Sequence, residues 1–270
     1  MATKDTEKLP IQVLDLGETT STNDFLKSRP MPEGIEMLVA TALHQTAGRG
    51  QGTNKWESEA GKNLLLSILV QPTMVPVAEQ FVLSMAGALA LKEALCRYAE
   101  GFTLKWPNDI YWHDSKISGT LIETSVSGHT LSRCIFGTGI NVNQQRFVGD
   151  APNPVSLCNI IGYETPIEEV LDEVLTAFWK YYNMVANGDY TKVARLYHES
   201  LYRLDGFHDY RDSGGIFSAR ISKVGLDGRL HLTLPDGRQR SYAFKEVAFV
   251  LPGNNKQGTN TITNRIHGKV

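Results

Sequence analysis

The chain has 270 residues and a formal net charge of −2 at pH 7, because 27 lysines and arginines nearly balance 29 aspartates and glutamates. This length allows one large domain, or a large and a small one, with a sizeable hydrophobic core. The charge balance lacks the basic excess typical of nucleic-acid-binding proteins, so we expect no nucleic-acid partner.

Neither the N-terminus nor the apolar segments predict export or insertion into a membrane. Residues 1–8 lack the apolar core of a signal peptide. The apolar run 64–70 is too short to cross a bilayer, and the run 81–96 is interrupted by Lys92 and Glu93. We therefore expect a soluble cytoplasmic protein that makes no membrane contact.

The cysteines are Cys96, Cys134 and Cys158. All three fall in apolar runs without the spacing of metal ligands, which predicts buried free thiols in a reducing cytosol rather than a zinc site. We expect no metal site built from protein ligands alone.

The first half of the chain predicts a series of strands and two helices. A short helix should begin at one of the N-cap candidates in Ser21-Thr22-Asn23-Asp24 and end near Arg29-Pro30. A longer helix is expected over 76–98, where apolar residues from Phe81 to Leu95 recur on one helical face. The polar, glycine-rich segment 45–63 joins two strands. The expected strands cover 11–16, 37–44, 63–70, 102–106, 110–112, 116–126 and 131–142.

The second half predicts helices followed by short strands. The expected helices cover 155–161, 166–186 and 189–204. From about Gly206 the composition changes, and the hairpin signals Asp227-Gly228 and Asp236-Gly237 separate strands. These strands cover 216–222, 229–234 and 240–244. The tail 252–270 is rich in Asn, Gly and Thr, which predicts poor order.

This pattern predicts an α+β fold, in which helices cover a mixed β-sheet and a small β-barrel follows. We expect a first domain over residues 1–205 and a second over 206–270, the latter including a flexible tail. Whether the chain forms a homodimer is left open, since no exposed edge strand can be located from the sequence.

The segment from Lys105 to Gly119 carries the most specific signal. It places two lysines, Lys105 and Lys116, and the carboxylate of Asp109 on a predicted β-hairpin that breaks at Pro107-Asn108. Charges fixed on rigid strands suit chemistry on an anionic substrate. A solvated, charged turn is the alternative interpretation of this segment taken alone.

A second candidate is the glycine-rich segment Gln45–Trp56. Its glycines allow the backbone to approach a ligand and to offer successive N–H groups to an anion, while Arg49 can bind a phosphate or a carboxylate. It is not a Walker A loop, because Gly61-Lys62 is followed by Asn63. A nucleotide must therefore be bound in another way.

Five motifs occur in a characteristic order. They are Ser21-Thr22-Asn23, Gly48-Arg49-Gly50 with Trp56, Lys105-Trp106-Pro107-Asn108-Asp109-Ile110, Lys116-Ile117-Ser118-Gly119, and Gly137-Thr138-Gly139-Ile140-Asn141-Val142-Asn143. Together they resemble the catalytic domain of biotin protein ligase, over roughly residues 10–252. The resemblance implies a class II aminoacyl-tRNA synthetase-like catalytic domain and an SH3-like C-terminal barrel. It also implies a monofunctional enzyme, since about ten residues precede the first strand and leave no room for a winged helix-turn-helix.

The resemblance implies two half-reactions. The carboxylate of biotin attacks the α-phosphorus of ATP, which gives biotinyl-5′-AMP and pyrophosphate. A lysine ε-amine of a biotin carboxyl carrier protein domain then attacks the activated carbonyl and releases AMP. ATP and Mg²⁺ are the implied cofactors, because cations must offset the repulsion between two anions.

Roles for individual residues follow from the same resemblance. The expected catalytic residues are Lys116, Asp109 and Arg49. The expected biotin-binding residues are Ser21, Thr22, Asn23, Gln45, Arg49, Gly50, Gln51, Lys116 and Gly119. The expected nucleotide-binding residues are Arg49, Gly50, Gln51, Trp56, Asn108, Lys116 and Asn141.

Physical chemistry supports these roles without excluding structural ones. Lys116, a compact cation, can hold the biotin carboxylate beside the α-phosphate. Asp109 can orient the carrier amine and remove its proton, since a free lysine has a pKa of about 10.4. Ser21 or Thr22 is equally suited to be a helix N-cap, and Asn141 to stabilise a turn. For Trp56 and Trp106, core packing is the stronger default. Lys105 is expected to be structural, and Glu123 to pair with a cation of the pocket.

The glycine-rich segment departs from the family pattern at two positions. Gln51 and Asn54 stand where the family has its second and third arginines, and Lys55 replaces part of the lost charge. We therefore expect weaker retention of the adenylate or a greater dependence on Mg²⁺.

Other functions remain as alternatives. A lipoate protein ligase or a lipoyl/octanoyl transferase shares the fold and an equivalent lysine, but the polar residues 21–23 and the C-terminal barrel favour biotin. A non-catalytic biotin-binding protein is suggested by the altered loop, whereas the presence of both Asp109 and Lys116 argues against it. A DNA-binding repressor is disfavoured by the short N-terminal segment and the net charge.

Overall fold

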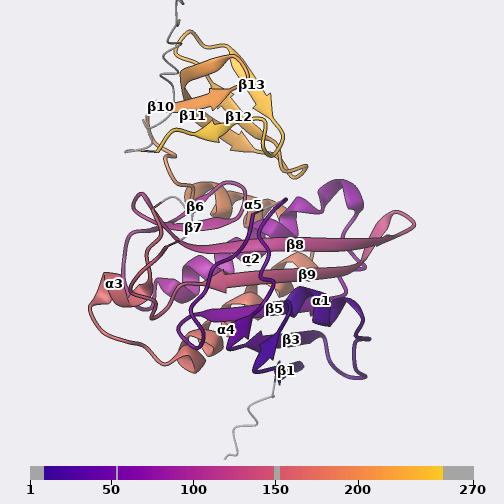
Figure 1. The fold of residues 1–270 in the computed structure, drawn as a ribbon. Helices are drawn as coiled ribbons and strands as arrows, with labels where there is room; N and C mark the ends of the chain where they lie inside the picture. The colour runs from indigo at the N-terminus through magenta and orange to yellow at the C-terminus, as the bar shows by residue number, and fades with distance from the viewer. Residues whose placement is uncertain (1–8, 53, 149–152, 252–270) are drawn as a thin grey trace, which may run out of the picture.

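The computed structural model describes residues 9–52, 54–148 and 153–251, and its main element is a seven-stranded mixed sheet (Figure 1). Its strands are β1 (Ile11–Asp15), β3 (Met37–Ala42), β5 (Leu64–Val70), β6 (Phe102–Lys105), β7 (Asp109–Trp112), β8 (Ser115–Ser127) and β9 (Thr130–Ile140). The spatial order is β1-β3-β5-β9-β8-β7-β6. β1 and β3 are parallel, and the other neighbours are antiparallel. The expected mixed sheet is therefore confirmed.

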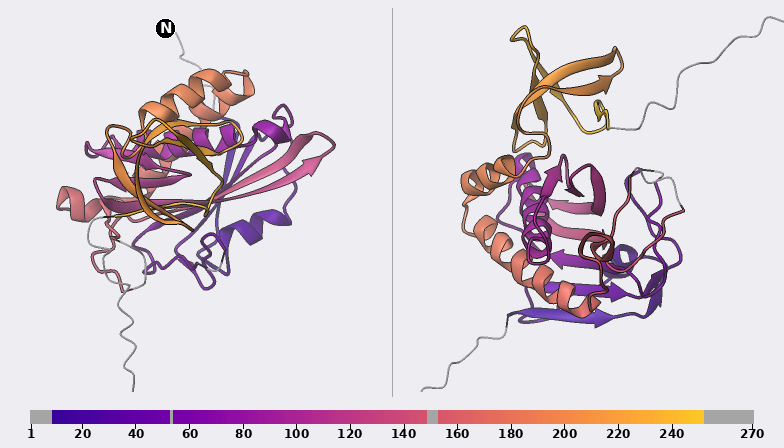
Figure 2. Two further views of the ribbon diagram at one scale, coloured as in Figure 1. Left: turned by 90° about the horizontal axis from the view of Figure 1, so that it is seen from above. Right: turned by 90° about the vertical axis from the view of Figure 1, so that its left-hand side faces the viewer.

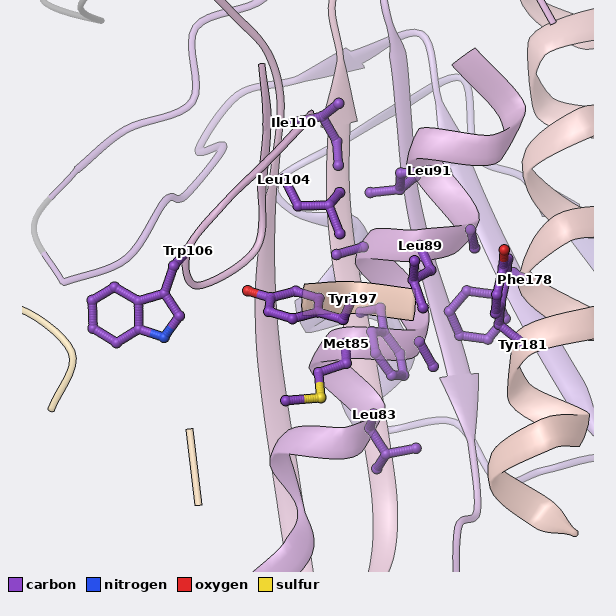
Figure 3. Packing of buried hydrophobic residues seen from close by; sticks show 14 of the residues in the cluster. Leu83, Met85, Leu89, Leu91, Leu104, Trp106, Ile110, Phe178, Tyr181 and Tyr197 are labelled. Atoms are coloured by element: carbon purple, nitrogen blue, oxygen red, sulfur yellow. The ribbon is translucent and has the colours of Figure 1, made fainter. Parts of the chain in front are cut away.

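One face of this sheet is covered by three helices, α2 (Phe81–Leu95), α4 (Ile167–Ala186) and α5 (Tyr190–Glu199). The right-hand view of Figure 2 shows α4 running along this face. Figure 3 shows the leucines and Met85 of α2 between the strands and the aromatic residues of α4. Met85, Ala88, Leu91 and Leu95 of the expected apolar face are buried, and most of the other residues of α2 are buried as well, because α2 lies between the sheet and α4.

The opposite face carries the short helix α1 (Thr22–Lys27), which packs against β3, β5 and β9. Leu26 of α1 is fully buried in a small cluster with Leu38, Ala40, Leu69 and Ile135. α1 begins where the N-cap candidates predicted, since Ser21 accepts a hydrogen bond from the Asp24 amide. The minor elements of this part are β2 (Glu18–Thr19), β4 (His44–Gln45), the 3₁₀ helix η1 (Val77–Glu79) and α3 (Leu157–Ile161).

A second, antiparallel sheet of five strands follows α5, in the order β13-β12-β11-β10-β14. Its strands are β10 (His208–Asp212), β11 (Gly215–Val224), β12 (Leu230–Thr233), β13 (Gln239–Tyr242) and β14 (Ala248–Phe249). The small C-terminal β unit is thus confirmed, although the sequence did not predict β10 and β14. It contacts the first sheet at Trp106, whose indole Nε1 donates to the carbonyl of Gly228 at 3.0 Å.

Two further expectations are corrected. Cys96 is exposed, because it lies just beyond the last turn of α2, whereas Cys134 and Cys158 are buried. α5 ends at Glu199 and not at 204, because the following backbone pairs with the edge strand β6. The Leu104 amide donates to Ser200, and the Tyr202 amide donates to Leu104.

No helix among residues 9–52, 54–148 and 153–251 is long and apolar enough to cross a membrane. The predicted disorder of the tail 252–270 lies outside the described residues.

Candidate active site

Three glycines of β8 and β9 form a strip of bare backbone on the face that carries α1. Gly119 and Gly139 are direct partners across the two strands, and Gly137 lies two residues before Gly139. Direct partners and residues two apart share one face of a sheet, so all three α-carbons face the same side. We call Gly119, Gly137 and Gly139 the glycine strip.

Side chains from distant segments lie directly on the glycine strip. A β-carbon on Gly137 would collide with Oδ1 of Asn23, and one on Gly139 would collide with the indole of Trp56. A β-carbon on Gly119 would lie 3.0 Å from Nζ of Lys116 and 3.3 Å from Oδ1 of Asp109. Glycine is therefore required here to allow close approach, and the strip brings together residues from four of the predicted motifs.

Lys116 and Asp109 form an ion pair over Gly119, with Nζ and Oδ1 2.7 Å apart. Their side chains are 23% and 21% exposed, so both are half-buried and yet accessible to a ligand. The Lys116 backbone is fixed by residues 153–155, because its amide donates to Asn153 and its carbonyl accepts from Val155. The predicted hairpin thus positions one cation and one carboxylate rigidly.

The turn that precedes Asp109 is fixed by its surroundings. The side-chain Nδ2 of Asn108 donates to the Thr120 carbonyl at 2.8 Å, and the Tyr197 hydroxyl donates to the Pro107 carbonyl at 2.6 Å. The Trp106–Pro107 peptide bond is cis. Lys105 lies beside two aromatic rings. Its Nζ lies 5.2 Å from the Tyr111 ring and 5.1 Å from the Phe249 ring, and burial lowers the pKa of Lys105.

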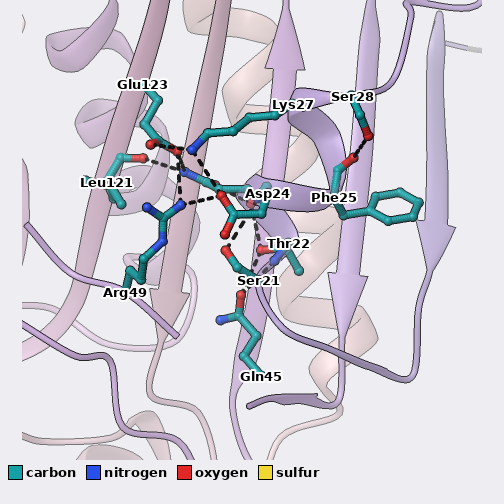
Figure 4. Close-up of polar contacts among 12 residues, drawn as sticks. Ser21, Thr22, Asp24, Phe25, Lys27, Ser28, Gln45, Arg49, Leu121 and Glu123 are labelled. Atoms are coloured by element: carbon teal, nitrogen blue, oxygen red, sulfur yellow. Dashed lines mark hydrogen bonds and ion pairs between the residues drawn. The ribbon is translucent and has the colours of Figure 1, made fainter. Parts of the chain in front are cut away.

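The N-terminus of α1 holds a buried polar network. Ser21, Thr22 and Asn23 are each at most 4% exposed. Oε1 of Gln45 accepts from the Thr22 amide at 2.8 Å (Figure 4). The Ser67 hydroxyl lies 2.7 Å from Oγ1 of Thr22. The Ser67 hydroxyl also lies 2.5 Å from Oδ1 of Asn23. These three segments thus place several hydrogen-bond donors and acceptors close together.

Arg49 belongs to a network of four charges beside this polar region (Figure 4). Its Nη2 lies 2.6 Å from Oδ1 of Asp24 and 3.7 Å from Oε2 of Glu123. Lys27 contacts both carboxylates, at 3.0 Å and 2.9 Å. The pKa of Lys27 is raised, first by its hydrogen bond to Glu123 and then by that to Asp24. The expected pairing of Glu123 with a cation is confirmed.

The glycine-rich segment folds into a tight turn. Arg49 and Lys55 form an antiparallel bridge, and the Gly50 amide donates to the Asn54 carbonyl at 2.7 Å. Gln51 is exposed at this turn. The indole of Trp56 lies on the glycine strip. Its Nε1 is buried without a hydrogen-bond partner among the described residues.

Asn141 lies next to the start of β8. Its amide Nδ2 donates to the Val155 carbonyl at 3.1 Å, and its backbone amide donates to Ile117. Its Oδ1 is buried without a partner among the described residues. Asn141 thus connects the segment that fixes Lys116 to β9, as expected for a turn-stabilising residue, and it retains one free acceptor.

The structure brings the residues of the glycine strip, the Lys116–Asp109 pair, Trp56 and the α1 network onto one face of the sheet. Sequence analysis missed three residues of this region, which are Asp24, Lys27 and Ser67. Asp24 directly follows the Ser-Thr-Asn motif, which was the available signal. Ser67 was hidden in the apolar run of β5, where its contact with Asn23 depends on how β5 and α1 pack.

A cavity of about 600 Å³ lies away from this region, beside the N-terminus of α4. It is lined mainly by β1, β3 and the start of α4, including Val13, Thr41 and Leu171. Val13 and Thr41 face the α4 side of the sheet, because their neighbour Val39 belongs to the core beneath α2 and α4. Since it contains neither the glycine strip nor the Lys116–Asp109 pair, we do not assign it to the candidate site.

Comparison with known proteins identifies relatives over most of the chain. The model of the Biotin/lipoate A/B protein ligase family matches residues 16–141. The biotin–[acetyl-CoA-carboxylase] ligase of Paracoccus denitrificans is 31% identical over 242 residues, which cover 83% of this chain and 95% of that protein. The bifunctional ligase/repressor BirA of Bacillus subtilis is 27% identical over 234 residues, which cover 84% of this chain and 70% of that protein.

Solved structures agree with these sequence matches. The biotin protein ligase of Aquifex aeolicus in complex with biotin and ATP superimposes with a TM-score of 0.73 at 25% identity. The superposition covers 88% of this chain and 98% of that protein. The chain belongs to the Biotin/lipoate A/B protein ligase family.

Proposed function

We propose that this enzyme is a biotin–protein ligase, which uses ATP to attach biotin to a lysine of a biotin carboxyl carrier protein domain. The observation that carries the proposal is the half-buried Lys116–Asp109 ion pair over Gly119, on the same face as the polar network of α1. The names of the relatives and the Aquifex complex with biotin and ATP support it. The proposed catalytic domain spans residues 1–205 and the SH3-like domain 206–270, and the proposed location is the cytoplasm.

In the first half-reaction, the biotin carboxylate attacks the α-phosphorus of ATP and pyrophosphate leaves. Lys116 holds the two anions together, because its ammonium can contact a carboxylate oxygen and a phosphate oxygen at once. Arg49 adds a second cation on the neighbouring loop. Both are held by carboxylates before ligands bind, Lys116 by Asp109 and Arg49 by Asp24. Such pre-orientation lowers the entropic cost of assembling the site.

In the second half-reaction, the carrier lysine attacks the carbonyl of the biotinyl-adenylate and AMP leaves. The incoming amine is mostly protonated at neutral pH, so a base is required. Asp109 is the proposed base, since ligand binding at Lys116 frees its carboxylate to accept a hydrogen bond from that amine. No nucleophilic serine or cysteine is needed, because the mixed anhydride is already activated.

The remaining predicted residues have binding roles in this proposal. Thr22, Asn23, Gln45 and Ser67 offer both donors and acceptors, as the neutral urea group of biotin requires. The indole of Trp56, with its unpartnered Nε1, lies where the nucleotide would be expected above Gly139. The polar atoms of this network suit the neutral urea group of biotin better than the apolar dithiolane of lipoate, because the urea can exchange hydrogen bonds with them.

Mg²⁺ fits this site as part of its complex with ATP. The described residues contain no group of three or more His, Cys, Asp or Glu that could hold a metal ion. Mg²⁺ is commonly bound by substrate phosphates with one or two carboxylates, and Asp109 is the available carboxylate over the glycine strip. The metal would neutralise phosphate charge during adenylation.

Biotin-dependent exchange between ATP and labelled pyrophosphate tests the proposal, with lipoate as the control substrate. We expect exchange with biotin and none with lipoate. Transfer should then be followed as a mass increase of a biotin carboxyl carrier domain with its acceptor lysine, compared with the same domain carrying arginine there. Exchange with lipoate alone would make the chain a lipoate ligase. Exchange with neither substrate would favour a non-catalytic binding protein.

A further inference from the structure

We propose that Lys245, in the turn between β13 and β14 of the C-terminal sheet, binds the β- and γ-phosphates of ATP across the glycine-rich turn. This inference rests on the proposed function, because it assigns a residue to the nucleotide site of that function. Lys245 carries no sequence motif. It is identified by its position, with Nζ only 2.6 Å from where a β-carbon of Gly52 would lie.

The turn that carries Lys245 is built rigidly. The Ala243 amide donates to the Glu246 carboxylate at 2.6 Å, and the Glu246 amide donates to the Ala243 carbonyl at 3.2 Å. Lys245 has φ +70°, which places a non-glycine residue in the left-handed region. Such a conformation is uncommon for lysine and is found preferentially at functional positions.

This turn contacts two segments of the candidate active site, which are the turn before Asp109 and the glycine-rich turn. Phe244 packs against Trp106, with ring centroids 5.8 Å apart, and Trp106 begins the turn that leads to Asp109. Lys245, the next residue, lies against Gly52 in the glycine-rich turn. The turn between β13 and β14 therefore places Phe244 against the turn before Asp109 and Lys245 against the glycine-rich turn.

The charges around the glycine-rich turn favour an anionic ligand for Lys245. Arg49 and Lys116 are each paired with a carboxylate, whereas Lys245 is exposed and has no acidic partner among the described residues. Glu246, the neighbouring acid, pairs with Arg229. The turn itself carries Gln51 and Asn54 rather than cations. Lys245 thus adds a cation to the tip of the turn, beyond Arg49 and Lys55, which pair where the turn begins and ends.

The β- and γ-phosphates are the assigned ligands because Lys245 is exposed and Lys116 is half-buried. The α-phosphate must lie beside Lys116, where the biotin carboxylate attacks it. The pyrophosphate group has to leave towards solvent, and a flexible lysine at the rim can hold it as a point charge and release it. Lys245 therefore stabilises the bound triphosphate and the departing pyrophosphate.

Titration calorimetry with α,β-methylene-ATP and Mg²⁺, in the presence of biotin, tests this assignment. The carbon bridge of the analogue prevents adenylation, so the experiment reports binding whether or not the chain is a ligase. We expect Lys245→Ala to weaken analogue binding roughly tenfold, as for the loss of one charge-assisted contact. AMP binding should be unchanged, because AMP lacks both assigned phosphates. Lys245→Arg should bind like the wild type, which a purely structural role would not predict.

Lys223→Ala is the matched control, since Lys223 is an exposed lysine of the same sheet with no contact to the glycine-rich turn. It should leave analogue binding unchanged. Equal analogue affinity of Lys245→Ala and the wild type would overturn the proposal, as would an equal loss of AMP affinity. Absence of pyrophosphate exchange in the wild type would instead contradict the ligase function, so the two failures are distinguishable.

Discussion

The ion pair between Lys116 and Asp109 indicates that the two side chains act in succession. An ammonium 2.7 Å from a carboxylate can bind an anionic ligand only by sharing or leaving that carboxylate. When biotin and the α-phosphate bind Lys116, Asp109 loses part of its partner and becomes available to the carrier amine. One pair can thus serve adenylation with its cation and transfer with its anion.

Replacement of each member should separate the two half-reactions. Lys116→Ala should reduce adenylation by at least about 10²-fold, because it removes a charge that stabilises the transition state. Asp109→Ala should reduce transfer from purified biotinyl-adenylate by about 10²-fold and affect adenylation less. Pyrophosphate exchange and single-turnover transfer measure the two steps. Lys180→Ala, on the outer surface of α4, is the control. Equal losses of both steps in the two variants would contradict this division.

The close contacts on the glycine strip allow a second prediction, which concerns Gly139. Gly139→Ala should displace the indole of Trp56, because the added methyl group would collide with it. Overpacking of this kind costs about 1–3 kcal/mol of unfolding free energy, and the displaced indole should also weaken nucleotide binding. Urea unfolding and ATP titration measure the two effects. In the control Gly214→Ala, the new β-carbon would lie 3.2 Å from a carboxylate oxygen of Asp212, which a small shift relieves. Wild-type stability and ATP affinity in Gly139→Ala would contradict the prediction.

The sequence predicted the residues that depend on local motifs and missed those that depend on packing. The N-cap at Ser21 and the hairpin charges follow from neighbours along the chain, so they were predictable. The contacts of Asp24 with Arg49 and of Ser67 with Asn23 join segments that are 25 and 44 residues apart. Only the packing of α1 on β5 brings these groups together, and no local pattern encodes that arrangement.

At the level of elements, α5 fixes the turn that precedes Asp109. Tyr197 is fully buried, and its hydroxyl donates to the Pro107 carbonyl at 2.6 Å. Tyr197→Phe should lower the unfolding free energy by about 1–3 kcal/mol, since it leaves a buried carbonyl without its partner. Transfer should slow as well, because Asp109 follows this turn.

Tyr190→Phe is the matched control on the same helix, because the Tyr190 hydroxyl makes only a 3.4 Å contact with Met74 near the surface. Denaturant unfolding of both variants measures the difference. Equal stabilities of the two variants would contradict the role given to Tyr197.

The contact between α2 and α4 should make stability depend on pH. Burial raises the pKa of Glu93, but hydrogen bonds from Lys180 and Tyr181 outweigh it, so the pKa is lowered overall. A carboxyl group whose pKa is lower in the folded than in the unfolded protein stabilises the fold at pH values above its unfolded pKa. This contribution is lost as the pH falls through the pKa of the folded state. Because the pair is partly exposed, we expect Glu93→Gln to cost less than about 1 kcal/mol at pH 7.

This difference from the wild type should shrink as pH falls below the unfolded pKa and through the lower folded pKa of Glu93, because the carboxyl is then protonated in both states. Urea unfolding of the wild type and Glu93→Gln at pH 7, 5 and 3 measures it. A difference that stays constant with pH would show that packing, rather than charge, explains the effect.

Helices and strands with a long, regular hydrophobic pattern were predicted well. Elements whose existence or burial depends on tertiary contacts were predicted less well. The central strands and α4 appeared close to their expected bounds. β14 was missed because two residues are too few to form a pattern, and it exists only by pairing with β10. In α2, residues outside the expected apolar face are buried too, because helices on one side and the sheet on the other cover it almost completely.

At the level of the whole molecule, the candidate site lies between parts that belong to different sheets. The mixed sheet supplies the glycine strip and the Lys116–Asp109 pair, while the smaller sheet supplies Phe244 and Lys245 beside the glycine-rich turn. Ligand binding should therefore draw the turn, the first sheet and the second sheet together. Closure of this kind would exclude water, which otherwise hydrolyses the mixed anhydride.

Limited digestion with trypsin tests this closure, because Arg49, Lys55 and Lys62 are cleavage sites in the 45–62 segment. We expect cleavage there to slow when biotin and ATP are both present and to change little with either ligand alone. The reason is that only the adenylate would contact the glycine-rich turn and both sheets at once. Lys116→Ala should remain cleavable with both ligands, because it cannot form the adenylate. Mass spectrometry of the fragments identifies the sites. If the wild type is cut equally fast with and without both ligands, the segment does not close over the adenylate.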